Sequence, residues 1–397
     1  MPEPLRILMI HNRYLIRGGE DASTDVSVDL LRAAGHEVCF LEDSNERVDD
    51  LGLMRTAARA VWSRESYARV SEILAPDTFD VVHVQNSFPL FSPSVHYAAS
   101  QRGVPVVQSL RNFRLLCPEG MLHRNGVVCT DCVGRRFAWP GVIHRCYRDS
   151  AAGSAVVATV SGGHRLAGTW KHRISRYVAP SFFAKDIYVR NGWDAGQIDV
   201  IPNFVYPDPG AGDGGGGFAL YAGRLAAVKG LDTLLEVWGD ENVPFPLKIA
   251  GEGPLLAQVE IAARSNPRIE YVGGLNSNDM TKLMGDAAFV VVPTRGIESF
   301  GRVVAEAMAT GTPAVVADHG GLRETVDGHG VGLLFPPGDS AGLRARVHWL
   351  AEHREDLAAM RGVARASFLE RFSGEKILSS WVDLYRELSS ARAGQGK

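Results

Sequence analysis

Residues 289–316 read FVVVPTRGIESFGRVVAEAMATGTPAVV and contain an apolar run, a glycine-containing loop, a helical stretch and a second apolar run, in that order. Neither FVVVPT nor TPAVV alternates between apolar and polar residues, which is typical of parallel strands that are covered on both faces. The helix between them is expected to begin at about Arg302. This order is a strand–helix–strand unit and predicts a parallel α/β sheet.

The same order recurs on both sides of this stretch. In the second half the other predicted strands are FALYAG, PLKIAG and IEYVGG, and in the first half they are RILMIHN, EVCFLE, VVHVQ, VPVVQSL and RYVAPS. Between the halves, PNFVYPDPGAGDGGGG has little to bury and predicts a flexible linker. We therefore expect a first domain over 1–200, a linker over 201–217, a second domain over 218–373 and a final helix over 374–397 with an apolar stripe.

Composition limits the classes of protein. A chain of 397 residues suits two domains of about 200 residues each. No apolar run approaches the roughly 20 residues of a membrane span, and the N-terminal run is too short for a signal peptide. We therefore expect a protein of the reducing cytoplasm, in which the five cysteines are thiols or metal ligands.

Positive charge is concentrated in residues 101–180. This basic band holds twelve Lys or Arg and three Asp or Glu, a net charge of +9, so the rest of the chain carries −12 of the total of −3. Such a band suits an anionic partner, such as a nucleotide diphosphate, a phospholipid headgroup or a nucleic acid. A solvated basic face is the alternative.

Two cations follow the first strand of the second half. Arg224 and Lys229 lie in the short loop RLAAVKG, at the end of the strand where α/β proteins bind ligands. Fixed positive charge together with the N–H groups of loops and of a helix N-terminus binds a diphosphate. The alternative is that the two side chains only solvate a turn.

Two carboxylates stand eight positions apart. Glu298 precedes the helix that begins near Arg302, so it could stabilise positive charge or bond sugar hydroxyls. Glu306 lies about one turn into that helix, where it could accept both hydroxyls of a ribose whose phosphates lie at the helix start. The alternative for Glu306 is an ion pair with Arg302, four residues earlier, worth at most a few tenths of a kcal/mol.

Nicotinamide chemistry is disfavoured. A dinucleotide fingerprint needs G-x-G-x-x-G directly after a strand. Here the glycine pair Gly18–Gly19 arrives late after the first strand, and the spaced triplet is absent.

A third pattern is a cysteine cluster in the basic band. Its order is C-x11-C-x2-C-x13-C, which lies within the spacing of structural zinc sites, with His123 and His144 as possible substitutes. Buried or incidental thiols are the equal alternative, and redox chemistry ranks last. The candidate ligands are Cys117, Cys129, Cys132 and Cys146.

Five motifs in order resemble the retaining glycosyltransferases of the GT-B fold, the large family 4 type. They are GGED, VIPN, YAGRLAAVKG, KIAGEGP and the Glu-x7-Glu pair, and the resemblance covers nearly the whole chain. It implies two Rossmann-like, doubly wound domains that face a central cleft. It also implies a C-terminal helix that packs back on the first domain, and a nucleotide sugar bound mainly by the second.

The resemblance also assigns roles. Arg224 and Lys229 would hold the diphosphate so that catalysis needs no metal, and Glu306 would hold the ribose. Glu298 and Arg111 would be catalytic, although relatives commonly have histidine where this chain has Arg111, and an arginine cannot act as a general base. The full set of implied donor-binding residues is Gly18, Gly19, Asn203, Arg224, Lys229, Gly273, Phe300, Gly301 and Glu306.

The expected function is therefore transfer of a sugar from a nucleotide-diphosphate sugar to an acceptor hydroxyl, with retention. Polysaccharide, glycolipid or natural-product glycoside biosynthesis would use such a step. Two rivals remain, a sugar-nucleotide epimerase of the same architecture and a non-catalytic nucleotide-sugar-binding protein. We expect no catalytic cofactor and no nucleic-acid partner, but a weak peripheral contact with the inner face of the membrane.

Overall fold

The computed structural model describes residues 3–15, 18–76 and 78–395, and its chain divides into two compact units. Unit 1 comprises Met1–Leu122, Cys129–Ile201 and Ile377–Lys397. Unit 2 comprises His123–Val128 and Pro202–Lys376. Each unit is described by itself.

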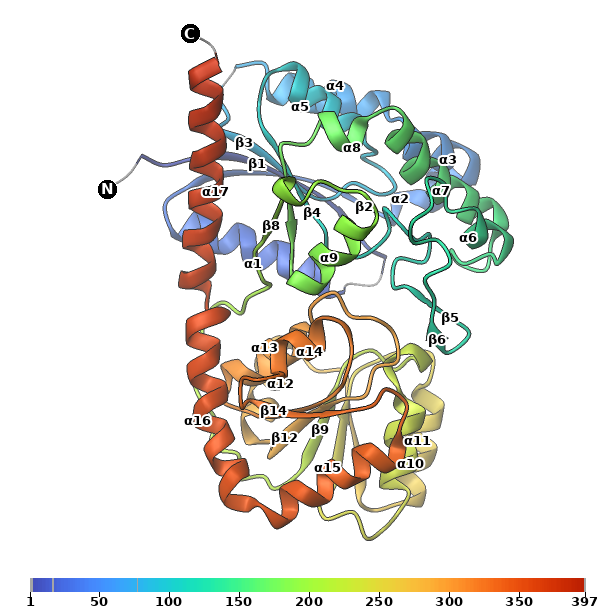
Figure 1. Ribbon diagram of the computed structural model, residues 1–397, viewed down its shortest axis with the longest axis vertical. Coiled ribbons are helices and arrows are strands. Elements are labelled where there is room, and N and C mark those ends of the chain that lie inside the picture. Colours follow the sequence, from blue (N-terminus) through green and yellow to red (C-terminus); the bar gives the residue numbers. More distant parts are fainter. Residues whose placement is uncertain (1–2, 16–17, 77, 396–397) are drawn as a thin grey trace. The chain divides into compact units, whose positions relative to one another are not determined.

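Unit 1 is built on a six-stranded parallel sheet with the order β2-β1-β3-β4-β7-β8 (Figure 1). Its strands are β1 (Arg6–Arg13), β2 (Glu37–Ser44), β3 (Val81–Asn86), β4 (Val106–Ser109), β7 (Arg176–Ala179) and β8 (Ile198–Val200). Its helices are α1 (Gly19–Ala33), α2 (Arg47–Leu51), α3 (Leu53–Val61), α4 (Arg64–Ile73), α5 (Ser94–Gln101), α6 (Trp139–Ile143), α7 (Ala151–Leu166), α8 (Thr169–His172), α9 (Phe182–Arg190) and α17 (Gly374–Gln395).

Unit 2 repeats this plan with the parallel order β11-β10-β9-β12-β13-β14. Its strands are β9 (Ala219–Ala222), β10 (Leu247–Ala250), β11 (Ile269–Gly273), β12 (Phe289–Val292), β13 (Ala314–Ala317) and β14 (Gly332–Phe335), and β5 (His123–Arg124) pairs with β6 (Val127–Val128) in a separate hairpin. Its helices are α10 (Leu231–Trp238), α11 (Leu256–Ser265), α12 (Ser277–Asp286), α13 (Arg302–Ala309), α14 (Gly320–Val326), α15 (Ser340–Glu352) and α16 (Arg354–Arg371).

The core of unit 2 lies on both faces of its sheet. Phe289 and Val291 of β12 pack into one cluster of buried apolar side chains, whereas Val290 and Val292 pack into the other. A strand that is buried on both faces needs apolar residues at every position. This is why the unbroken run FVVV was a reliable strand signal.

The expected linker, residues 201–217, packs against other segments of unit 2 through backbone contacts. Gly212 N donates to Thr310 O at 2.9 Å, and a Cβ at Gly212 would lie 2.4 Å from the backbone of Gly285. Further upstream, Val205 forms an isolated parallel bridge with Ser373. The glycines of this segment therefore permit close backbone approach, where the sequence suggested only flexibility.

The final helix has the predicted apolar stripe. Trp381, Leu384 and Tyr385 of α17 are buried, and Tyr385 Oη lies 2.7 Å from Nδ1 of His83 on β3. The His83 ring also lies 4.6 Å from that of Trp381, centre to centre. These contacts fasten α17 to the sheet of unit 1.

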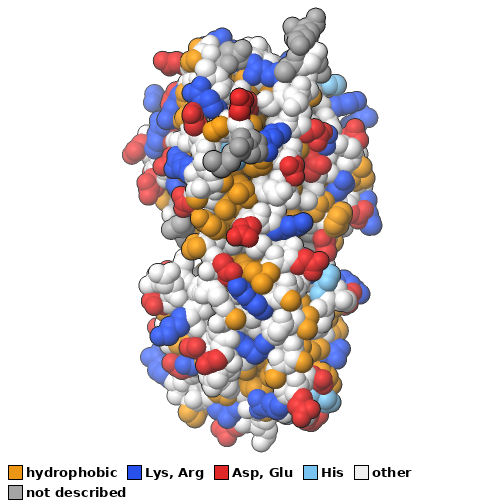
Figure 2. Space-filling model, turned by 90° about the vertical axis from the view of Figure 1, so that its left-hand side faces the viewer, with side chains coloured by type: hydrophobic (Ala, Val, Ile, Leu, Met, Phe, Trp, Pro, Cys, Tyr) orange, Lys and Arg blue, Asp and Glu red, His pale blue; other side chains and the backbone are white. Residues whose placement is uncertain are grey.

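The surface drawn in Figure 2 carries acidic and basic side chains interspersed, with apolar ones scattered among them. Among the residues described, every helix is too short or too polar to cross a bilayer.

Candidate active site

Two loops of unit 2 meet at the carboxyl ends of β9 and β12, which are neighbours in the sheet. The first holds residues 223–230 and the second residues 293–301. Lys229 of the first donates a hydrogen bond from Nζ to Oε1 of Glu298 in the second, and the two form an ion pair. Both side chains keep about a quarter of their surface exposed, 26% and 24%. The structure thus brings together two predicted site residues, as partners of each other.

Backbone contacts fix how these loops meet. Thr294 Oγ1 and Arg295 N both donate to Val228 O, at 3.0 and 2.9 Å. Gly230 has a φ of +73°, and a Cβ there would lie 1.9 Å from Pro293 O. Only glycine allows the first loop to turn into α10 against the exit of β12. The position of Lys229 is therefore set by backbone packing.

Arg224 lies in the same loop as Lys229 and is exposed. Tyr221 Oη donates to Arg224 O at 2.8 Å, and Leu225 N donates to Glu252 O at 2.8 Å. Glu252 belongs to the loop after β10, the KIAGEGP motif. The motifs YAGRLAAVKG and KIAGEGP follow the neighbouring strands β9 and β10 and are hydrogen-bonded to each other.

The start of α13 presents backbone rather than side chain. Phe300 is only 3% exposed and its ring packs 5.3 Å from that of Phe372, while Gly301 adopts a φ of +94° before the first helical residue. Gly321 N, in the first turn of α14, donates to Glu298 O at 2.9 Å. The first turn of α14 thus holds the backbone at Glu298, in the loop that leads into α13.

Glu306 makes the ion pair that was the alternative to a ribose contact. Arg302 Nε donates to Glu306 Oε1 at 2.7 Å, and both side chains are partly exposed. The ribose role stays a prediction. Any ribose bound there would share the carboxylate with Arg302 or displace it.

Two further donor-binding candidates lie in unit 2. Gly273 ends β11 with a φ of +83°, and its carbonyl accepts from Gly251 N at 2.9 Å. It therefore lies at the same carboxyl edge of the sheet as the loops of Arg224 and Lys229. Asn203 is half-buried just after β8, at the beginning of unit 2.

In unit 1 the glycine pair opens α1. Asp21, in the first turn, accepts from Gly18 N at 3.0 Å and from Tyr14 N at 3.3 Å, and its Oδ1 lies 2.7 Å from Nε2 of the buried His11. Burial acts to raise the pKa of Asp21, but the hydrogen bonds from His11, Gly18 and Tyr14 outweigh it and lower that pKa. The aspartate of GGED thus anchors Gly18, a role that the sequence analysis missed.

The glutamate of GGED connects this loop to the residues after β4. Glu20 accepts from Tyr14 Oη and from Asn112 Nδ2, both at 2.7 Å. Burial and the charge of Glu20 raise the pKa of Tyr14, so its hydroxyl remains protonated. Asn112 follows Arg111, so Glu20 fixes the segment that carries the predicted catalytic arginine.

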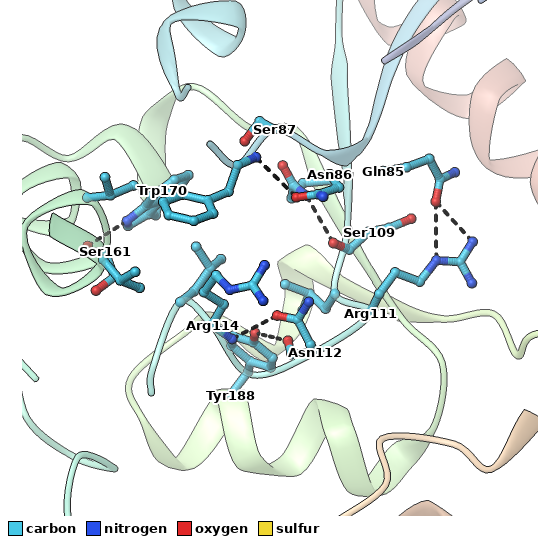
Figure 3. A pocket seen from close by; sticks show the side chains of 16 residues that line it. Gln85, Asn86, Ser87, Ser109, Arg111, Asn112, Arg114, Ser161, Trp170 and Tyr188 are labelled. Carbon is cyan, nitrogen blue, oxygen red and sulfur yellow. Dashed lines mark hydrogen bonds between the residues drawn. The ribbon is translucent and has the colours of Figure 1, made fainter. Parts of the chain in front are cut away.

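A pocket lies beside this segment, at the carboxyl ends of β3 and β4 (Figure 3). Asn86, Ser109 and Asn112 give it amide and hydroxyl groups, and Trp170 and Tyr188 give it aromatic walls. Tyr188 Oη donates to Asn112 O at 2.8 Å, which fixes one side. A mixture of this kind suits a ligand with hydroxyl groups and apolar faces, as a sugar has.

Two arginines line the same pocket. Arg111 turns toward Gln85 (Figure 3), whose Oε1 accepts from its Nε at 3.2 Å and its Nη2 at 2.9 Å. Arg114 stacks on Phe88, 5.4 Å from the ring centre, and donates to Tyr14 Oη at 3.2 Å. Its Nε is buried and has no hydrogen-bond partner within the described chain. The pocket is therefore cationic as well as polar.

His83, which lies within reach of the charge of Arg111, cannot replace the missing general base. His83 is fully buried between Tyr385 and Ser109, whose hydroxyl lies 2.9 Å from its Nε2. Burial, and then the charge of Arg111, hold the pKa of His83 well below its usual value. It is a neutral core histidine that joins β3 to α17.

The four predicted zinc ligands lie in unit 1, and zinc binding by them stays a prediction. Cys132 packs with Ala138 and Ala158, and burial followed by the nearby Cys117 raises the pKa of its thiol to about 12. Cys129 and Cys146 also raise the pKa of the Cys132 thiol, so the four thiols lie close to one another. However, the described part of the chain has no group of three or more His, Cys, Asp or Glu placed to hold a metal ion.

Two family models match the chain in succession. Residues 18–203 match the glycosyl transferase 4-like domain, and residues 209–366 match glycosyl transferases group 1. A phosphatidyl-myo-inositol mannosyltransferase of Mycobacterium leprae is 32% identical over 394 residues, 95% of this chain and 95% of that one. The chain belongs to the group 1 glycosyltransferases.

Other relatives of this glycosyltransferase match in part. An uncharacterized glycosyltransferase of Methanocaldococcus jannaschii is 30% identical over 208 residues, which cover 51% of this chain and 58% of that protein. The D-rhamnosyltransferase WbpZ of Pseudomonas aeruginosa is 30% identical over 160 residues, 39% of this chain and 42% of that one. The chain thus spans about half the length of these two relatives.

Solved structures establish the fold of the glycosyltransferase. A sucrose-phosphate synthase of Thermosynechococcus elongatus has a TM-score of 0.71 at 16% identity, covering 98% of this chain and 100% of its own. HepE of Anabaena, solved in complex with UDP, has a TM-score of 0.67 at 17% identity, covering 96% and 100%. The prediction of a GT-B fold with two Rossmann-like domains is confirmed.

Proposed function

We propose that this glycosyltransferase moves a sugar from a nucleotide-diphosphate sugar to an acceptor hydroxyl, with retention of anomeric configuration. The observation that carries the proposal is the convergence of Lys229, Glu298 and the start of α13 at the carboxyl ends of β9 and β12. A cation, loop N–H groups and a helix N-terminus at one strand edge suit a diphosphate. The UDP bound by HepE and the mannosyltransferase relative support this donor class.

In this proposal the ion pair between Lys229 and Glu298 is exchanged when the donor binds. The diphosphate oxygens take over Lys229, and Arg224 on the same loop adds the second cation, so the leaving group is neutralised without a metal ion. Glu298 is then released to face the sugar. Its negative charge stabilises the positive charge that develops at the anomeric carbon, while Glu306 binds the ribose.

The acceptor would occupy the pocket of unit 1. Asn86, Ser109 and Asn112 would bond its hydroxyl groups, and Trp170 would pack against an apolar ring face. Arg111 is catalytic in this proposal as a fixed positive charge, since a guanidinium stays protonated at ordinary pH. With Arg114 beside it, the pocket favours an acceptor that carries an anionic group. Acceptors of polysaccharide, glycolipid or natural-product glycoside biosynthesis fit this description.

A panel of nucleotide sugars tests the proposal against its two rivals. We expect slow hydrolysis of one donor, and transfer with retention once a hydroxyl acceptor is supplied, with the anomeric configuration read by NMR. Activity should survive addition of a chelator. An isomerised donor without any acceptor would identify an epimerase, and binding without turnover would identify a non-catalytic binding protein.

A further inference from the structure

Strand β3 carries one residue more than its neighbour β1 near its carboxyl end. Val84 and Asn86 each pair with a residue of β1, whereas Gln85 between them does not. An extra residue of this kind bends a strand and re-aims the side chain at that point, and such irregularities are common beside active sites. Gln85 is only 3% exposed, and it lines the pocket at the end of the sheet where α/β proteins bind ligands.

Arg111 determines which way the amide of Gln85 points. A guanidinium has donors and no acceptor, so the atom that faces it must be the amide oxygen. Oε1 of Gln85 accepts from Nε of Arg111 at 3.2 Å and from Nη2 at 2.9 Å (Figure 3). Two hydrogen bonds from one planar group restrict the rotation of a long side chain that is otherwise free to change rotamer. Gln85 therefore sets both the position and the plane of the guanidinium.

The nitrogen of the same amide is held from the other side. Nε2 of Gln85 lies 3.3 and 3.2 Å from the two ring nitrogens of His83, and it donates to Sδ of Met9 at 3.4 Å. His83 is itself fixed by the hydroxyls of Tyr385 and Ser109. Turning the amide over would place its NH2 group against the donors of the guanidinium. The amide is therefore locked in one orientation between the sheet of unit 1 and α17.

The contact between Gln85 and Arg111 involves a neutral acceptor. The amide carries no charge, and His83 behind it is neutral because burial and the charge of Arg111 hold its pKa well below its usual value. A carboxylate in the place of the amide would form an ion pair with the guanidinium and offset its charge. A neutral acceptor instead fixes the guanidinium and leaves its positive charge undiminished at this contact.

We infer that Gln85 is the positioning residue for Arg111 in the transfer reaction. It holds the guanidinium at the pocket in the orientation in which its charge acts on the reacting groups, and it takes no part in the chemistry itself. The inference rests on the proposed function, in which Arg111 supplies a fixed positive charge. It has a consequence that a structural role would lack, because Gln85 should matter to turnover only while Arg111 is present.

A double-mutant cycle tests this consequence. Q85M removes the acceptor and keeps an unbranched side chain of similar length. It should lower kcat by about 10-fold or more, because hydrogen bonds to a charged group are lost, and leave the KM values of donor and acceptor nearly unchanged. In the R111A background the same substitution should change the residual kcat by less than about twofold.

Q108M is the matched control. Gln108 is a buried glutamine of the neighbouring strand β4 that lines the same pocket, but its Oε1 lies 2.8 Å from Nε2 of His96, and its Nε2 donates to Ser109 O at 2.9 Å. Whatever Q108M does to kcat, the factor should be the same with Arg111 and in the R111A background, because effects of sites that do not share a partner add.

Hydrogen exchange of the Arg111 Nε–H, followed by NMR as the signal that R111A lacks, tests the positioning without any substrate. Exchange should be faster by about 10-fold or more in Q85M than in the wild type and in Q108M, since the hydrogen bond that protects the group is lost. Melting temperatures show that each variant is folded. The inference is overturned if Q85M exchanges like the wild type, or if it lowers kcat by the same factor with and without Arg111. A wild type that transfers no sugar would contradict the proposed function, and the exchange rates would still decide whether Gln85 positions Arg111.

Discussion

The two glutamates of the proposed site differ in the cation that each holds. Glu298 pairs with Lys229 across two loops, whereas Glu306 pairs with Arg302 within one helix. The position of Lys229 and Glu298 after strands made them predictable from sequence. Their pairing was not, because it depends on how β9 and β12 lie side by side, which no local pattern records.

Replacing Glu298 by Gln should lower kcat and leave the affinity for a free nucleotide diphosphate unchanged or tighter. The amide cannot stabilise positive charge on the sugar, and Lys229 no longer has a carboxylate that competes with phosphate. Steady-state kinetics and titration with the nucleotide diphosphate measure the two effects. A weaker nucleotide affinity with normal kcat would contradict the catalytic role.

Replacing Glu306 by Gln should change the donor KM, where Glu298→Gln changes kcat. A ribose contact is made equally in the ground and transition states, so its loss raises the donor KM and leaves kcat nearly unchanged. Loss of a hydrogen bond to a charged group should reduce the binding free energy of the donor by about 1.5–3 kcal/mol. Kinetics with saturating acceptor measure it, and a lowered kcat at unchanged KM would rule out the ribose assignment.

Arg224→Ala and Lys229→Ala should each weaken binding of donor and of free nucleotide diphosphate by about 1.5–3 kcal/mol. Calorimetric titration measures this, and Arg264→Ala is the control, because Arg264 is an exposed arginine of α11 that pairs with Glu260. If Lys229→Ala binds as tightly as Arg264→Ala, the diphosphate is held elsewhere.

At the scale of elements, buried strands were predictable and some edge strands were not. FVVV of β12 is apolar at every position because both faces are covered, whereas β8 and β14 lie at sheet edges and keep half-buried residues. Edge strands have fewer neighbours and so need fewer apolar residues. This is why the run IDV escaped the sequence analysis, whereas GLLF is apolar throughout and was overlooked.

Gly230 gives a prediction about one loop. Alanine there would meet Pro293 O at 1.9 Å in addition to adopting a positive φ, whereas alanine at Gly273 meets nothing within 4 Å and has only the positive φ. We expect Gly273→Ala to cost about 1–2 kcal/mol of stability and Gly230→Ala distinctly more. Denaturant unfolding measures both, and equal losses would show that the loop yields without strain.

At the scale of the molecule, buried neutral histidines should make unit 1 sensitive to acid. Burial lowers the pKa values of His83 and His164, and that of His96 to about 4. The unfolded chain binds these protons below about pH 6.5 and the folded chain does not, so stability is full above that pH and falls as pH is lowered. For His96 alone the loss reaches about 3 kcal/mol near pH 4.

Urea unfolding of the wild type and of His96→Gln between pH 7 and 4.5 measures this effect. The variant should lose less stability per pH unit than the wild type, whatever its stability at pH 7. Identical slopes would mean that His96 is protonated in the folded chain.

The path of the chain makes most of unit 2 an exchangeable segment. The backbone leaves unit 1 after Ile201 and re-enters it at Ile377, and the bridge between Val205 and Ser373 holds the outgoing and returning segments together. A chimaera in which residues 202–376 come from another member of the family needs two joints close to each other, and it leaves the β5–β6 hairpin of unit 2 in the recipient chain. Under the proposed donor assignment, sugar preference should then move with residues 202–376, while the pocket of unit 1 keeps its own backbone.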